Sequence, residues 1–257
     1  MLKSRIIPCL LMREEGLVKT INFENEKYIG DPLNTLKIFN EKEVDEIIIL
    51  DIGCSRHHKQ PNFELISKLA AECRMPLCYG GGIKEIQDVE RIINLGVEKI
   101  ALNSGLFDNP KLVGESAHKF GSQSVAVVID VKKTGFLRKN FQVFKTHGTV
   151  NTQLNPFEFA KQLEDQGAGE IVLQSIDNDG LLTGYDLELI EQMHSSVNIP
   201  ITVIGGAGSY EDFRKLINKF KIIGIGAGSV FVFKGKYRAV LIQYPEKVEK
   251  NKIYFNN

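Results

Sequence analysis

Eight apolar runs, separated by segments with helical periodicity, are the feature that most constrains the fold of this chain. Between the runs, apolar residues recur at the three- and four-residue spacing of amphipathic helices, as at Phe157, Ala160 and Leu163. Asn155-Pro156 and Gly167 are start and stop signals for that helix. Eight alternating βα units over 257 residues predict an α/β fold, the (β/α)8 TIM barrel. The eight runs span Arg5–Leu11, Glu46–Ile52, Met75–Tyr79, Lys99–Leu102, Val125–Ile129, Glu170–Leu173, Ile199–Ile204 and Ile222–Ile225.

The sequence also contains an internal repeat. YGGGI (79–83) and ALNSG (101–105) in the first half correspond to IGGAG (204–208) and IGAGS (225–229) in the second. Two half-barrel repeats of four βα units each would produce this pattern. The same correspondence places Leu11 opposite Asp130. No linker rich in Pro, Gly or Ser interrupts the alternation, so we expect a single domain over residues 1–257.

Charge and cysteine usage exclude several classes of function. Thirty-two basic residues balance thirty-two acidic ones, which disfavours binding to nucleic acid or to an anionic membrane. The four cysteines form no CxxC pair and are expected to be reduced in a cytoplasmic protein. The apolar run near the start is too short for a signal sequence, and His57 and His58 lack metal-ligand spacing. We therefore expect neither a metal nor a cofactor.

Candidate site residues follow the predicted strands, where the active face of a barrel lies. Asp130 is a carboxylate directly after a buried strand. Glycine-rich turns let backbone N–H groups approach an oxyanion, although one such turn alone would only indicate a tight connection. Two sets at equivalent places favour a ligand with a phosphate at each end. The first set is Gly80–Gly82 with Asn103 and Ser104, and the second is Asp179, Gly180, Gly205, Gly206, Gly228 and Ser229.

Short motifs in one order give the chain a resemblance to a known family. From Met1 to about Phe233 it resembles the HisF family, the cyclase subunit of imidazole glycerol phosphate synthase. The resemblance implies a heterodimer with a HisH-like glutaminase that supplies ammonia. It implies a lyase reaction in histidine biosynthesis that converts a phosphorylated ribulosyl aminoimidazole carboxamide (PRFAR) to imidazole glycerol phosphate and AICAR. The motifs are RIIPCL (5–10), NFEN (22–25), GDP (30–32), LDI (50–52), GGGI (80–83), FGSQ (120–123), GAGEI (167–171), SID-x-DG (175–180), GYD (184–186) and GGAG (205–208).

The resemblance also implies roles for individual residues. Two aspartates would share the acid–base work; Asp130 is one, and Leu11 occupies the position of the other. Lys19 matches a lysine expected to fold over a substrate phosphate. The phosphate-binding residues would be Gly82, Asn103, Ser104, Asp179, Gly180, Gly206, Gly228 and Ser229. The ammonia entrance would be a ring of Arg5, Glu46, Lys99 and Glu170, each of which is by itself an ordinary charge at a strand start.

Some positions depart from the family pattern. Gln174 replaces the usual Thr, the loop 132–149 with His147 differs, and an atypical tail from about 234 to 257 replaces the last helix. Pro245 is expected to end a helix there after about two turns. Thr183, Asp51 and Lys19 could replace the acid missing at Leu11, although their spacing gives no support for this.

Three interpretations remain open. The first is the HisF-type synthase subunit. The second is a HisF-like paralogue that channels ammonia from a HisH-like glutaminase to a sugar amidotransferase in surface-polysaccharide biosynthesis, which the Leu11 exchange and the tail favour. The third is a barrel that only binds a phosphorylated ligand to regulate its partner. The charged ring disfavours the third, because a binding protein needs no pore.

Overall fold

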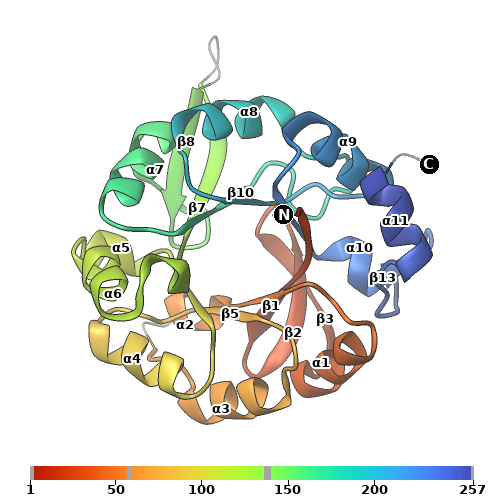
Figure 1. The fold of residues 1–257 in the computed structure, drawn as a ribbon, viewed down its shortest axis with the longest axis horizontal. Helices are drawn as coiled ribbons and strands as arrows, with labels where there is room; N and C mark the ends of the chain where they lie inside the picture. The colour runs from red at the N-terminus through yellow and green to blue at the C-terminus, as the bar shows by residue number, and fades with distance from the viewer. Residues whose placement is uncertain (1–2, 57–58, 136–139, 256–257) are drawn as a thin grey trace.

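The structure, a computed structural model, describes residues 3–56, 59–135 and 140–255. Within these residues, eight parallel strands close into a barrel, because each pairs with its neighbour and the last pairs with the first (Figure 1). All eight predicted strands are confirmed. They are β1 (Arg5–Arg13), β4 (Ile47–Asp51), β5 (Leu77–Gly80), β6 (Lys99–Leu102), β7 (Val125–Thr134), β10 (Glu170–Ser175), β11 (Ile201–Ile204) and β12 (Gly224–Ala227).

Helices surround the barrel on the outside (Figure 1). Asn155 caps α7 as expected, since its Oδ1 accepts hydrogen bonds from the N–H groups of Phe157 and Glu158. The fold is therefore the predicted (β/α)8 TIM barrel. The outer helices are α1 (Pro32–Glu41), α3 (Phe63–Glu72), α4 (Ile86–Asn94), α6 (Leu112–Phe120), α7 (Pro156–Asp165), α8 (Leu187–Ser196), α9 (Tyr210–Phe220) and α11 (Lys247–Phe255).

Successive side chains of a barrel strand point alternately into two apolar cores, one under the outer helices and one inside the barrel. In β1, Ile6 and Leu10 pack outward under the helices, whereas Ile7, Cys9 and Leu11 belong to the small core inside the barrel. Because the side-chain period of a strand is two, Arg5 shares the inward face at the start of the same strand. One strand thus places an arginine at the amino end of the barrel interior and Leu11 near its carboxyl end.

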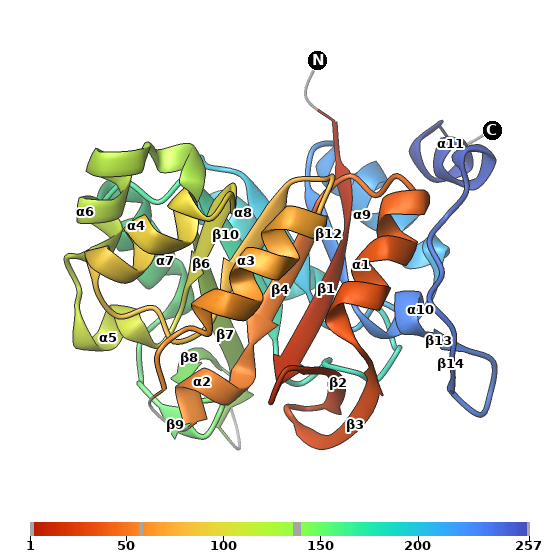
Figure 2. The ribbon, with the colours of Figure 1, turned by 90° about the horizontal axis from the view of Figure 1, so that it is seen from below.

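Additional elements cover the carboxyl end of the barrel, the lower end in Figure 2. A hairpin of β2 and β3 follows β1, and β8 and β9 follow β7. Short helices lie after three of the strands. These elements are β2 (Gly16–Ile21), β3 (Glu24–Gly30), β8 (Asn140–Lys145), β9 (Val150–Asn151), α2 (Ile52–Arg56), α5 (Gly105–Asp108) and α10 (Ser229–Val232). The 3-10 turn η1 (Ser122–Ser124) directly precedes β7 and so lies at the amino end.

The C-terminal tail differs from the expectation. It forms a short hairpin of β13 (Phe233–Lys234) and β14 (Ala239–Val240), and the helix α11 follows Pro245 instead of ending there. The prediction of a helix stopped by Pro245 was wrong. Proline lacks an N–H, but the first turn of a helix does not need that donor, so a proline just before a helix is compatible with it. The tail thus supplies an eighth outer helix, at the amino end of the barrel (Figure 2).

In the part of the chain that the structure describes, no helix is long and apolar enough to cross a membrane. Cys9, Cys54 and Cys78 are buried and Cys73 is partly exposed, and all four are free thiols.

Candidate functional site

A cavity of about 230 Å³ opens at the carboxyl end of the barrel. Its walls come from the ends of β1, β4, β5, β6 and β7 and from the loops that follow them. Predicted site residues Gly82, Asn103, Ser104 and Asp130 all line it, together with Leu11. The residues expected after the strands of the first half-barrel therefore share one space with Asp130, from the first strand of the second half.

Asp130 is the buried acid of this cavity, with 6% of its surface exposed. Asn103 Nδ2 donates a hydrogen bond of 3.2 Å to its Oδ2 and another of 3.0 Å to the carbonyl of Val128. Burial raises the pKa of Asp130 to about 7; the Asn103 hydrogen bond opposes this shift, and the charge of Asp179 adds to it. A carboxyl group with such a pKa can give or take a proton at neutral pH.

The Asp130 carboxyl is therefore expected to titrate near pH 7. In an unfolded chain its pKa would be about 3.9. The folded state holds this proton more tightly than the unfolded state, so its contribution to stability is lost as pH rises from about 4 to about 7. Carboxyl-carbon NMR titration, with Asp130→Asn to assign the signal, measures the midpoint. Unfolding of both proteins at several pH values should show the wild type losing stability relative to the variant over that window. A midpoint near 4 would contradict the expectation.

Leu11 faces the same cavity as Asp130 and is 5% exposed. It pairs with Leu50 on β4 and belongs to the inner core with Val128. Its side chain presents a methyl surface at the position where the sequence comparison of the two half-barrels expects an acid.

The groups considered as substitutes for that acid lie differently. Asp51 lines the cavity, but its Oδ1 accepts hydrogen bonds from the N–H groups of Gly53 and Cys54, and its Oδ2 accepts one from Cys54 Sγ. Thr183 is exposed and does not line the cavity. Lys19 lines a second pocket, which shares Leu11 and Gln174 with the first. None of the three occupies the place of Leu11.

The first glycine-rich turn has a backbone conformation that residues with a side chain rarely adopt. Gly82 has φ +73°, and a β-carbon there would crowd the side chain of Cys54 and the backbone near Pro61. Ser104 Oγ donates to Asn103 Oδ1 at 3.0 Å, which fixes the two polar side chains beside the turn. The glycine turn and two hydrogen-bonding side chains thus border one end of the cavity.

The second set of residues lines a smaller pocket of about 20 Å³. Lys19 is 8% exposed and reaches into this pocket, where its Nζ donates to the carbonyl of Cys9 at 2.9 Å. A β-carbon at Gly228 would collide with Lys19 Nζ, so glycine is required for this close approach. Burial lowers the pKa of Lys19, although Cys9 and Asp179 act in the opposite direction. The predicted residues in this pocket are Lys19, Asp179, Gly180, Gly206, Gly228 and Ser229.

The β2–β3 hairpin, which carries Lys19, is held over this pocket by Asp179. Thr20 Oγ1 donates to Asp179 Oδ2 at 2.7 Å, and the N–H of Phe23 donates to the same oxygen at 3.2 Å. The N–H of Asn22 also donates to the Asp179 carbonyl at 3.0 Å. Asp179 therefore anchors the hairpin that positions the lysine.

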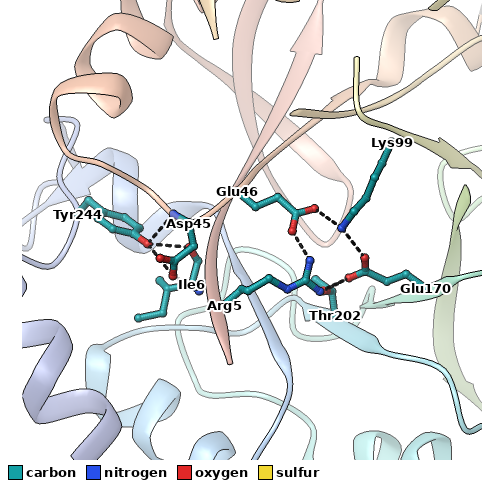
Figure 3. Close-up of polar contacts among 8 residues, drawn as sticks. All are labelled: Arg5, Ile6, Asp45, Glu46, Lys99, Glu170, Thr202 and Tyr244. Atoms are coloured by element: carbon teal, nitrogen blue, oxygen red, sulfur yellow. Dashed lines mark hydrogen bonds and ion pairs between the residues drawn. The ribbon is translucent and has the colours of Figure 1, made fainter. Parts of the chain in front are cut away.

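At the amino end of the barrel, Arg5, Glu46, Lys99 and Glu170 form a closed ring of alternating charges (Figure 3). Arg5 pairs with Glu46 and, at 2.7 Å, with Glu170. Lys99 Nζ lies 2.9 Å from a carboxylate oxygen of each glutamate. Thr202 Oγ1 donates to Glu170 Oε1 at 2.5 Å. Each charge in the ring thus faces two opposite charges.

The two glutamates of the ring have different electrostatic surroundings. Burial disfavours the charged form of Glu170, but the charges of Arg5 and Lys99 and the Thr202 hydrogen bond outweigh it and lower its pKa. At Glu46 burial outweighs the attraction of Arg5 and Lys99 and raises the pKa. The hydrogen bond from Thr202 is a contact that only Glu170 has.

Several residues of these sites escaped the sequence analysis. Thr202 joins the ring, and it could have been found from the strand period, because it lies two residues before the inward-facing Ile204. Lys145 and His147 also line the cavity. His147 was noted only as part of a divergent loop, and neither was expected at the site, because they come from an added strand and turn that periodicity does not place. His57 and His58 lie outside the described residues. Among the described residues, no group of three or more His, Cys, Asp or Glu side chains could hold a metal ion.

Comparisons with known proteins agree with one another. A family model described as a histidine biosynthesis protein matches residues 5–238. A protein of Vibrio vulnificus (strain YJ016), provisionally named imidazole glycerol phosphate synthase subunit hisF3, is 54% identical over 252 residues, which cover 98% of this chain and 96% of the relative. A Leptospira interrogans protein, provisionally named as subunit HisF, is 51% identical over 255 residues, 99% of this chain and all of the relative. Imidazole glycerol phosphate synthase subunit HisF of Lactococcus lactis subsp. cremoris (strain SK11) is 40% identical over 255 residues, 98% of this chain and 96% of the relative. With a family model over most of its length and relatives of this identity, the chain belongs to the HisF family of imidazole glycerol phosphate synthase subunits.

Proposed function

We propose that the chain is the synthase subunit of a glutamine amidotransferase that receives ammonia from a HisH-like glutaminase. In this role it forms imidazole glycerol phosphate and AICAR from PRFAR, a step of histidine biosynthesis. The observation that carries the proposal is the placement of the charged ring and of the Asp130 cavity at opposite ends of one barrel.

The barrel interior between the two ends suits a small neutral molecule. It is filled by an apolar core that includes Ile7, Cys9, Ile48 and Val172. Ammonia can pass between such side chains in its uncharged form, whereas an ammonium ion would lose its hydration. The ring, with two positive and two negative groups, closes the entrance without holding a strong net charge.

The cavity end suits a phosphorylated small molecule. Backbone N–H groups around Gly82, together with Asn103 and Ser104, offer donors at one side. Lys19, with Gly180, Gly206, Gly228 and Ser229, offers a cation and donors at the other. A ligand with two phosphates would span the distance between these two sets, with Asp130 near its middle.

Leu11 favours a second candidate function. A cyclisation needs a proton donor and a proton acceptor. Among the described residues that line this cavity, Asp130 is the one buried carboxyl that is not held by backbone N–H groups. In the second function, the chain is a HisF-like paralogue that passes ammonia from the glutaminase to a sugar amidotransferase of surface-polysaccharide biosynthesis. Both functions use the ring, and they differ in the chemistry at the cavity.

Mixing the purified chain with a HisH-like glutaminase is expected to raise glutamine hydrolysis by that partner, and the two should co-elute in size-exclusion chromatography. Lys99→Met should weaken the stimulation, because it removes a ring cation that faces both glutamates. Lys119→Met is the matched control, since Lys119 pairs with Glu90 on the outer helices. If no complex forms and glutamine hydrolysis does not change, the ammonia function is wrong.

A further inference from the structure

Asp45, the residue just before Glu46, is held by the C-terminal tail (Figure 3). Its Oδ2 accepts hydrogen bonds from the N–H of Ile6 at 2.9 Å and from the hydroxyl of Tyr254 at 3.2 Å. Its Oδ1 pairs with Lys250 Nζ at 2.7 Å. One carboxylate thus joins the tail helix to the start of β1.

Tyr244 makes a second connection between the tail and the same two strands. Its hydroxyl donates to the carbonyl of Ile6 at 2.8 Å and accepts from the N–H of Asp45 at 3.3 Å. The side chain is 4% exposed and packs against Phe231, with ring centroids 5.4 Å apart. A rigid buried ring therefore fixes the starts of β1 and β4 relative to each other.

The contacts of the tail surround Arg5 on both sides. The Tyr254 hydroxyl shares its one proton between Asp45 Oδ2 and the carbonyl of Ser4, which lies 3.0 Å away, and the Tyr244 hydroxyl donates to the carbonyl of Ile6. Arg5, between them, must reach Glu46 and Glu170 at once. A small shift of either strand start would break one of these two ion pairs.

We propose that Tyr244 and Asp45 are positioning residues for the Arg5–Glu46 side of the ring. The other side has its own support, because Thr202 on β11 binds Glu170. The C-terminal tail therefore sets how firmly the ring is closed, and this effect on ammonia entry rests on the proposed function. The ring closes the ammonia entrance, and the tail holds its Arg5–Glu46 side in place.

Tyr244→Phe removes the hydroxyl and keeps the packing of the ring. Leaving the Ile6 carbonyl and the Asp45 N–H without this partner should raise transient opening at Arg5 by about tenfold. The measurement is hydrogen exchange of the Arg5 side-chain N–H groups by NMR, which reports on the ion pairs of Arg5 and not on general stability. Asp45→Asn should act in the same direction, and it is the second variant if Tyr244→Phe does not fold.

Gln243→Leu is the matched control from the same tail. Gln243 Nε2 donates to the carbonyls of Val230 and Phe233, away from the ring, so its loss should weaken the tail without raising Arg5 exchange. Equal Arg5 exchange in wild type and Tyr244→Phe would overturn the proposal. An equal rise in Gln243→Leu would also overturn it, since the effect would then come from general loosening of the tail.

A second readout separates this inference from the proposed function. In the complex with the glutaminase, Tyr244→Phe should reduce the stimulation of glutamine hydrolysis severalfold, and Gln243→Leu should not. If the wild type gives no stimulation while Arg5 exchange still rises in Tyr244→Phe, the proposed function fails and the positioning role stands. Normal stimulation by both variants, with unchanged Arg5 exchange, removes the positioning role alone.

Discussion

Leu11→Asp is expected to raise the formation of imidazole glycerol phosphate from PRFAR and ammonium salt by about 100- to 10,000-fold, the usual contribution of a general acid or base. The new carboxylate would enter the cavity that Asp130 lines, at the equivalent place of the other half-barrel. Two carboxyl groups in one cavity can divide the work of proton donor and proton acceptor. The measurement is steady-state product formation with ammonium salt, so that no glutaminase is needed.

The control for this prediction is Leu11→Asn, which has nearly the same shape as the aspartate but carries no titratable proton. It should remain at the low rate of the wild type. If the wild type already turns over at the rate of HisF family members, and Asp130→Asn abolishes that rate, the paralogue function is wrong. If Leu11→Asp gains nothing over Leu11→Asn, the single missing acid does not explain a low rate.

Glu170→Gln is expected to lower the free energy of unfolding by about 3 kcal/mol, the low end of the cost of breaking a buried ion pair. Glu170 is 6% exposed and faces Arg5, Lys99 and Thr202. With an amide at this position, Arg5 and Lys99 would each keep only one of their two carboxylate partners. The low end applies because the Arg5 side chain is 29% exposed. Urea unfolding at pH 7 measures the change, and the melting temperature should fall by roughly 6–12 °C.

The control for this variant is Glu188→Gln, because Glu188 forms an exposed pair with Lys133 and such pairs contribute little.

The effect of Glu170→Gln should also depend on pH in a defined direction. The pKa of Glu170 is lower in the folded state than in the unfolded chain, where it is about 4.3. The stability that Glu170 contributes is therefore present above about pH 4.3 and is lost as the pH falls through the pKa of the folded state. Equal destabilisation by the two variants at pH 7 would contradict the role of the ring in stability.

The sequence was informative about strands and strand ends for a physical reason. Buried parallel strands must be apolar over several residues, so a run such as Val125–Ile129 is visible without any tertiary information. The residue that follows, Asp130, is then placed at the active face by the topology of the barrel. The tail had no such signal, because a helix after Pro245 depends on contacts of Tyr244 with Ile6 and of Tyr254 with Ser4, far away in the sequence.

By itself the sequence determined the barrel, its two-fold repeat and which residues stand at the two ends of each strand, because the strand period and the glycine turns are local properties. Only the tertiary structure decided which of these residues meet. Closure of the barrel brings Arg5, Glu46, Lys99 and Glu170 into one ring, and the β2–β3 hairpin carries Lys19 to Gly228. It also places Leu11 in the cavity of Asp130, because closure of the barrel turns the inward faces of β1 and β7 toward one shared interior.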